Sequence, residues 1–168
     1  LGVPMGDRVT GADLVPALAE RAAEKGYSMF LLGAREGVGL RAAEILQERY
    51  PGLQIAGVIS PPNVAIQEMD RTILDQIRRA KPDILLVAFG NPKQEKWIRM
   101  YADTIKVPVC IGVGGTFDMI AGITRRAPRW IQRAGLEWMY RLLQEPKRLW
   151  RRYVHDFGYF GYFFIRQW

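Results

Sequence analysis

The sequence predicts an α/β fold: a Rossmann-like parallel sheet with helices on both faces, followed by a helical, basic and aromatic C-terminal appendage. Two observations predict this architecture. Apolar strand patterns alternate with amphipathic helix patterns through the first 124 residues, which is typical of βαβ units in a parallel sheet. The composition then changes at about Thr124, and this change divides the chain into regions 1–124 and 125–168.

The first helix is expected over residues 10–26, where Thr10 or Asp13 supplies an N-cap and Gly26 ends the helix. The elements after it alternate regularly. We expect strand 27–34, helix 39–52, strand 53–60, helix 67–80, strand 83–90, helix 92–103, strand 107–115 and a short helix from about residue 116. Pro92 suits a first helical turn, because the N–H that proline lacks has no partner there in any case.

The appendage differs from the rest of the chain in charge and in aromatic content. Residues 1–124 carry 14 Lys or Arg and 14 Asp or Glu, whereas residues 125–168 carry 10 and 3, so the whole net charge of +7 lies in the appendage. It also holds 12 of the 19 aromatic residues. We expect one helix over residues 129–145 and a second from Pro146. These biases predict a role for the appendage that differs from that of the sheet.

Composition excludes several classes of site. Cys110 is the one cysteine and lies in an apolar run, so we expect a buried structural thiol rather than a nucleophile or ligand. His155 is the one histidine, so this sequence offers neither a His-rich metal site nor a Ser-His-Asp triad. No metal and no cofactor are expected. The sequence has no apolar run of about 18 residues and no secretory signal, so we expect an intracellular protein.

Ligands of open parallel sheets bind beyond the carboxyl ends of the strands, and three such ends carry suggestive residues. At the first, Gly33 and Ala34 precede a helix N-terminus that suits a nucleotide diphosphate or base. Gly37, Gly39 and Ala42 then match G-x-G-x-x-A, which suggests a dinucleotide fold. The glycines lie too late for the strand-to-helix turn, however, and no acidic residue ends the next strand. Because of these two departures, a nicotinamide oxidoreductase is only a minor alternative.

The second strand end is AFGNPKQEKW, where Gly90 permits close backbone approach and a helix N-terminus faces the same edge. Asn91 and Gln94 offer amide groups to sugar hydroxyls or phosphate, and Lys93 adds a positive charge. The alternative is a capped helix with a solvated first turn, in which Asn91 is the N-cap and Glu95 a first-turn acid.

The third strand end is GVGGTFDMIAG, where Gly112, Gly114 and Gly115 leave room for a ligand against the backbone. Asp118 stands just inside the following helix, where its carboxylate either holds a ribose or uracil edge or caps the helix. Three such ends in one sheet together predict a nucleotide-sugar or dinucleotide cleft.

Five segments resemble one known family. They are RVTGADL, LLGA, GNPKQEKW, GVGGTFDMIAGITRRAPRW and GLEWMYRLLQEPKRLWRRY, and in this order they closely resemble the WecG/TagA/CpsF glycosyltransferases over nearly the whole chain. The resemblance implies an inverting, metal-independent enzyme that moves an N-acetylmannosamine-type or related sugar from a UDP donor to a polyprenol-diphosphate-linked sugar. Such enzymes build teichoic acid linkage units, enterobacterial common antigen, capsule or exopolysaccharide. The implied location is the inner face of the bacterial cell membrane, where the enzyme is peripheral.

The resemblance also implies roles for particular residues. They are Gln94 as an active-site residue, Asn91 and Asp118 as donor contacts, Arg8 as a substrate contact, and Arg141, Arg148 and Arg151 as diphosphate clamps from the appendage. Charge grows on the diphosphate as the sugar leaves, so an enzyme without a divalent metal needs guanidinium groups or helix N-termini to stabilise that charge. Without the resemblance, a solvated basic face is the favoured interpretation of these arginines.

The appendage interleaves aromatic and basic residues, which fits a segment at the boundary of an anionic membrane. A homo-oligomer interface is an alternative that is compatible with membrane binding, and stacking on single-stranded nucleic acid is a second alternative. We expect no nucleic-acid partner.

Inverting transfer needs a general base. The resemblance implies that this base is an aspartate in an Asp-Gly motif upstream of RVTG. That motif is not in this sequence, and we do not assign its role to Asp7. Because the chain begins with Leu1 rather than Met, we expect an N-terminal part to be missing; catalytic impairment is the other explanation. A non-catalytic nucleotide-sugar or lipid-binding module of the same fold therefore stays open.

Overall fold

The structure is a computed structural model that describes residues 10–133, 135–144 and 146. The chain divides into two compact units, Leu1–Ile123 and Thr124–Trp168. The first unit contains the sheet and the helices that cover it. In its described residues, the second unit contains two short helices, and each unit is described here by itself.

The first unit is built on four parallel strands in the order β2-β1-β3-β4. The strands are β1 Ser28–Gly33, β2 Gln54–Ile59, β3 Ile84–Ala88 and β4 Val109–Gly112. The chain leaves β1 toward β2 on one side and leaves β3 toward β4 on the other. The sheet therefore has its topological switch point between the carboxyl ends of β1 and β3, where open α/β sheets bind ligands.

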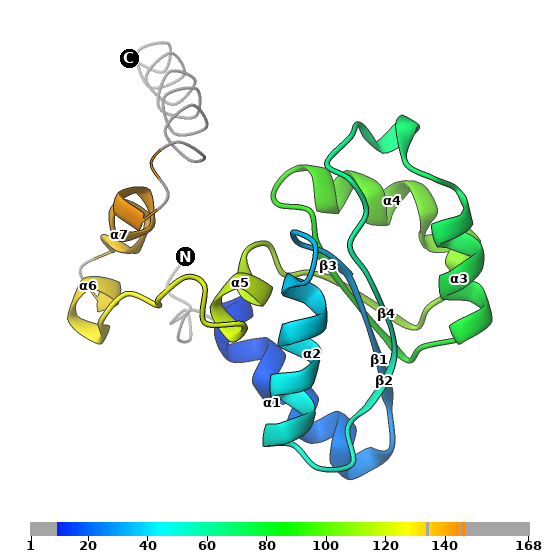
Figure 1. The fold of residues 1–168 in the computed structure, drawn as a ribbon, viewed down its shortest axis with the longest axis horizontal. Helices are drawn as coiled ribbons and strands as arrows, with labels where there is room; N and C mark the ends of the chain where they lie inside the picture. Colours follow the sequence, from blue (N-terminus) through cyan, green and yellow to red (C-terminus); the bar gives the residue numbers. More distant parts are fainter. Residues whose placement is uncertain (1–9, 134, 145, 147–168) are drawn as a thin grey trace, which may run out of the picture. The chain divides into compact units, whose positions relative to one another are not determined.

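Helices cover both faces of this sheet, which confirms the predicted fold class (Figure 1). One face carries α1 Gly11–Lys25, α2 Val38–Arg49 and α5 Thr116–Ile120. The other carries the 3₁₀ helix η1 Ile66–Glu68, α3 Thr72–Ala80 and α4 Lys93–Ile105. Successive side chains of a strand point to opposite faces, so Leu31 packs in the first core and Leu32 in the second. Burial on both faces explains why β1 and β3 are continuous apolar runs.

Two predicted helices and the predicted burial of Cys110 need correction. The helix expected over 67–80 is interrupted, because Asp70 accepts a hydrogen bond from the Thr72 N–H at 2.8 Å and so starts α3 there. The helix over 92–103 begins at Lys93, with Pro92 as its cap residue after a cis peptide bond. Cys110 is half-buried rather than fully buried, and burial raises the pKa of its thiol, which keeps the thiol neutral.

The second unit contains α6 Arg129–Arg133 and α7 Glu137–Gln144 in place of one helix over 129–145. Gly135 separates them because it adopts a left-handed φ of 72°, which ends α6. The helix expected from Pro146 lies outside the described residues, apart from Pro146 itself. Among the described helices, none combines the length and apolar character needed to cross a membrane.

Asp83 gives the first prediction, because it ties β3 to the start of β1. Its carboxylate accepts hydrogen bonds from the Ser28 N–H at 2.8 Å and from the Ser28 hydroxyl at 2.9 Å, and these bonds lower the pKa of Asp83. A lowered pKa in the folded state stabilises the fold at neutral pH, and this stabilisation is lost as the pH falls through that pKa. We expect Asp83→Asn to lower the urea midpoint at pH 7, with a difference from wild type that narrows toward pH 2. A difference that stays constant with pH would contradict this role.

Gly33 gives the second prediction, because it pairs with Ala88 at the carboxyl ends of β1 and β3. Its φ is 106°, and a Cβ there would lie 2.8 Å from the carbonyl carbon and oxygen of Ala88. Gly26 also has a positive φ, 72°, but no described atom lies within 4 Å of a Cβ there. We expect Gly33→Ala to lower the free energy of unfolding by more than about 2 kcal/mol, and Gly26→Ala by about 1 kcal/mol. Urea unfolding measures both, and equal losses would show that the contact with Ala88 is unimportant.

Candidate functional site

The candidate site begins at the carboxyl end of β1, next to the switch point. The Ala34 N–H donates to the Ala88 carbonyl at 3.1 Å, so the ends of β1 and β3 are hydrogen-bonded beyond the last strand residues. Ala34 itself has a φ of 62°, unusual for a residue with a side chain. This conformation turns the chain from β1 toward α2 and leaves the predicted residues Gly33 and Ala34 at the carboxyl edge of the sheet.

The glycine pattern after β1 does not form a dinucleotide-binding turn. Gly37 is the N-cap of α2, and Gly39 lies inside its first turn, packed against Val58 and Ser60 of the neighbouring strand end. The Ser60 hydroxyl donates to the Gly33 carbonyl at 3.1 Å, at the position where an acidic residue would hold a ribose. These positions agree with the objections raised from the sequence and do not favour a nicotinamide cofactor.

Residues 90 to 95 follow the end of β3 and lead into α4. Gly90 has a φ of 79°, and no described atom lies within 4 Å of a Cβ built there. Asn91 is exposed and donates its side-chain amide to a Glu95 carboxylate oxygen at 3.4 Å. Asn91 is therefore accessible from this edge while Glu95 restrains its side chain.

Gln94 points inward from the first turn of α4, although it is polar. Its side chain is buried, with 5% of the residue exposed. Its Oε1 accepts a hydrogen bond from the Gly114 N–H at 2.9 Å, and its Nε2 donates to Glu95 at 2.9 Å. Gln94 thus connects the helix after β3 to the glycine loop after β4.

Asp118 lies in the short helix α5 and is the buried carboxylate of this site. Its side chain is 6% exposed and accepts a hydrogen bond from the Arg35 guanidinium at 2.9 Å, whereas the Arg35 side chain is 60% exposed. A buried carboxylate needs such a partner because charge is costly away from water. Arg35 was not among the predicted residues. Its position directly after Ala34, at a strand end, is the one signal that pointed to it.

Lys93 points toward protein groups rather than along the strand ends. Its ammonium donates to Asn63 Oδ1 at 3.1 Å and to the Val64 carbonyl, and it lies 5.5 Å from the centre of the Phe89 ring. Partial burial lowers the pKa of Lys93. The lysine therefore connects the loop after β2 to the start of α4, which is a role that its sequence context did not indicate.

The predicted residues fall into two groups. The first is brought together at the carboxyl edge of the sheet and consists of Gly33, Ala34, Asn91, Gln94, Gly114, Gly115 and Asp118. Of the remaining ones, Lys93 contacts the loop after β2, Arg141 lies in α7 of the second unit, and Arg8, Arg148 and Arg151 lie outside the described residues. Within the described part of the chain, no three His, Cys, Asp or Glu residues group closely enough to hold a metal ion.

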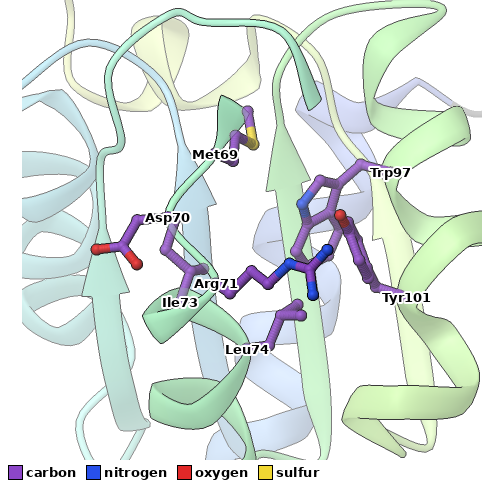
Figure 2. Close-up of a pocket in the computed structure, with 7 residues that line it drawn as sticks. All are labelled: Met69, Asp70, Arg71, Ile73, Leu74, Trp97 and Tyr101. Atoms are coloured by element: carbon purple, nitrogen blue, oxygen red, sulfur yellow. The ribbon is translucent and has the colours of Figure 1, made fainter. Parts of the chain in front are cut away.

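A small hollow lies on the α3 and α4 face, away from these residues (Figure 2). Figure 2 shows the rings of Trp97 and Tyr101 on one side and the segment that leads into α3 on the other. The hollow is lined by Met69, Asp70, Arg71, Ile73, Leu74, Trp97 and Tyr101. Its cavity volume is about 10 Å³, whereas ligand pockets measure roughly 300–1,000 Å³. It is too small for a nucleotide sugar, so the strand ends are the better candidate.

Three curated relatives carry the same name, N-acetylglucosaminyldiphosphoundecaprenol N-acetyl-beta-D-mannosaminyltransferase. The relative from Bacillus spizizenii strain W23 is 39% identical over 152 residues, which are 90% of this chain and 57% of that protein. The relative from Bacillus subtilis strain 168 is 39% identical over 146 residues, 86% of this chain and 55% of that protein. The relative from Staphylococcus aureus strain MRSA252 is 35% identical over 148 residues, 88% and 57% respectively. The chain thus spans about half the length of these proteins.

The match to a family is wider than any of these pairwise matches. Residues 1–168 match the family described as the glycosyl transferase WecG/TagA/CpsF family. Of the five segments that carried the resemblance, LLGA, GNPKQEKW and the start of GVGGTFDMIAGITRRAPRW lie at the ends of β1, β3 and β4, which the structure brings to one edge of the sheet. The chain belongs to the WecG/TagA/CpsF glycosyl transferase family.

Proposed function

We propose that this chain binds the donor in a glycosyltransferase that moves an N-acetylmannosamine-type sugar from UDP to a polyprenol-diphosphate-linked sugar. The observation that carries the proposal is that three strand ends, with their glycines and the buried Asp118, share the carboxyl edge of the sheet, beside its switch point. Family membership and the names of the relatives support the reaction class and the acceptor. Teichoic acid or another cell-surface polysaccharide is the product pathway that fits.

The donor is proposed to lie beyond β1 and β3. Gly33 and Ala34 end β1 shortly before the N-terminus of α2, and a helix N-terminus is a place that a diphosphate can approach. The Arg35 guanidinium is mostly exposed beside them and is of the right charge. Asn91 is exposed at the next strand end and suits the sugar hydroxyls. Asp118 is proposed to accept from the ribose or uracil, with Arg35 holding its carboxylate in place.

The second unit is proposed to act on the diphosphate and at the membrane surface. Arg141, Arg148 and Arg151 are the proposed clamps, since departure of UDP leaves negative charge that guanidinium groups stabilise. Trp130 and Leu143 are exposed, 69% and 75% respectively, in a unit rich in arginine. Aromatic and basic residues together favour the boundary of an anionic bilayer, where a lipid-linked acceptor is found. We assign no general base within these 168 residues.

The third prediction concerns the reaction itself. The full-length protein is expected to release UDP when it is given UDP-N-acetylmannosamine and a short-chain polyprenol-diphosphate-GlcNAc acceptor, and to do so equally well in EDTA.

Asp118→Asn is expected to raise the donor KM about tenfold, because a neutral amide replaces the carboxylate that is proposed to accept from the donor. Arg148→Ala is expected to lower kcat about 100-fold, since the charge of the leaving group loses a partner. UDP release in a coupled assay measures all three.

The controls for this assay separate the alternatives. Arg49→Ala, an exposed arginine in the last turn of α2, is the matched control for Arg148→Ala. Loss of turnover in EDTA would contradict the metal-independent mechanism. UDP binding without turnover on any donor would favour the non-catalytic module, and tight NAD binding that UDP does not displace would favour an oxidoreductase.

A further inference from the structure

We infer that Gln94 is a positioning residue: with Glu95 it forms a side-chain latch that holds the loop Gly112–Gly115 in the conformation the donor requires. The latch is defined as the Gln94 and Glu95 side chains and the hydrogen bond from the Gly114 N–H to Gln94. This inference rests on the proposed function for its ligand, the nucleotide-sugar donor. It differs from the sequence-based expectation, in which Gln94 contacts the substrate directly.

The two ends of the Gln94 amide have different protein partners. Oε1 accepts from the Gly114 backbone N–H at 2.9 Å, and Nε2 donates to a Glu95 carboxylate oxygen at 2.9 Å. Glu95 fixes this orientation, because the reversed amide would place its oxygen against a carboxylate and its NH₂ against an N–H. The carboxylate thus ensures that an acceptor always faces the loop.

The shape of the loop matches the buried amide. A Cβ at Gly112 would lie 2.6 Å from Gln94 Nε2 and 2.9 Å from its Cδ, so a larger residue there would displace the amide. Gly114 adopts a φ of 55°, a conformation that favours glycine and turns its N–H toward Gln94. Both glycines therefore serve the latch.

The latch acts on the donor site through the start of α5. The loop continues into Thr116, whose hydroxyl donates to the Val113 carbonyl at 2.6 Å, and two residues later reaches Asp118. A shift of Gly114 would therefore move Gly115 and the Asp118 carboxylate together. Binding sites lose affinity steeply when polar groups move by about 1 Å, so release of the latch weakens donor binding without removing any contact residue.

Exchanging the two side chains tests this inference. Gln94→Glu alone places two carboxylates together, removes the donor to Glu95 and is expected to raise the donor KM about tenfold. The double variant Gln94→Glu/Glu95→Gln restores both hydrogen bonds. The new carboxylate at position 94 accepts from the Gly114 N–H, and the new amide at position 95 donates to that carboxylate. Its KM is expected to return to within about twofold of wild type, as strong coupling between contacting residues requires.

A second measurement reports on the latch without any reaction. The Gly114 amide is expected to exchange its hydrogen faster in Gln94→Glu than in wild type, and at the wild-type rate in the double variant. Glu48→Gln, at an exposed glutamate of α2, is the matched control and is expected to alter neither readout.

The inference is overturned if the double variant recovers Gly114 protection but keeps the high KM of Gln94→Glu, because Nε2 would then serve the substrate directly. It is also overturned if Gly114 exchange is the same in all variants. If wild-type protein shows no affinity for UDP-sugars, the proposed function fails instead, and the exchange rates alone decide whether the latch exists.

Discussion

The close approach of β1 and β3 at their carboxyl ends is the constraint on which the rest of the site depends. The Gly33 position leaves no room for a Cβ against the Ala88 carbonyl, and the Ala34 N–H donates to that carbonyl. From this point the chain continues from β1 to β2 on one side of the sheet and from β3 to β4 on the other side. A glycine at this position therefore lets β1 and β3 pair as far as their carboxyl ends at the switch point, which is where ligands of this fold class bind.

The polar residues around this point are held in place by hydrogen bonds to other side chains of the protein. Asp118 and Gln94 are both buried, and each has its side chain fixed by a neighbour, Arg35 in one case and Glu95 in the other. Fixed polar groups lose little freedom when a ligand binds, which favours affinity. Lys93 extends the same arrangement to the loop after β2. The candidate site is thus a set of loops joined by side-chain hydrogen bonds across neighbouring strand ends.

The sequence predicted the alternation of strands and helices because that pattern is local, but it did not predict what long-range contacts decide. Burial on both faces makes β1 and β3 visible as apolar runs, whereas the pairing of Arg35 with Asp118 joins residues that lie 83 positions apart. The break before α3 was missed because one local hydrogen bond, from the Thr72 N–H to the Asp70 carboxylate, interrupts a continuous helical pattern. The inward direction of Gln94 was missed for a related reason, since a polar residue in a first turn is ordinarily solvated.

The central claim is that the donor nucleotide binds across the carboxyl ends of β1 and β3. The most direct measurement is the crystal structure of the full-length protein with UDP. We expect the diphosphate beside Gly33 and Ala34 and the uridine within reach of Asp118, with the hydrogen bond from Gly114 to Gln94 intact. UDP bound in the hollow between α3 and α4, or anywhere away from these strand ends, would contradict the account.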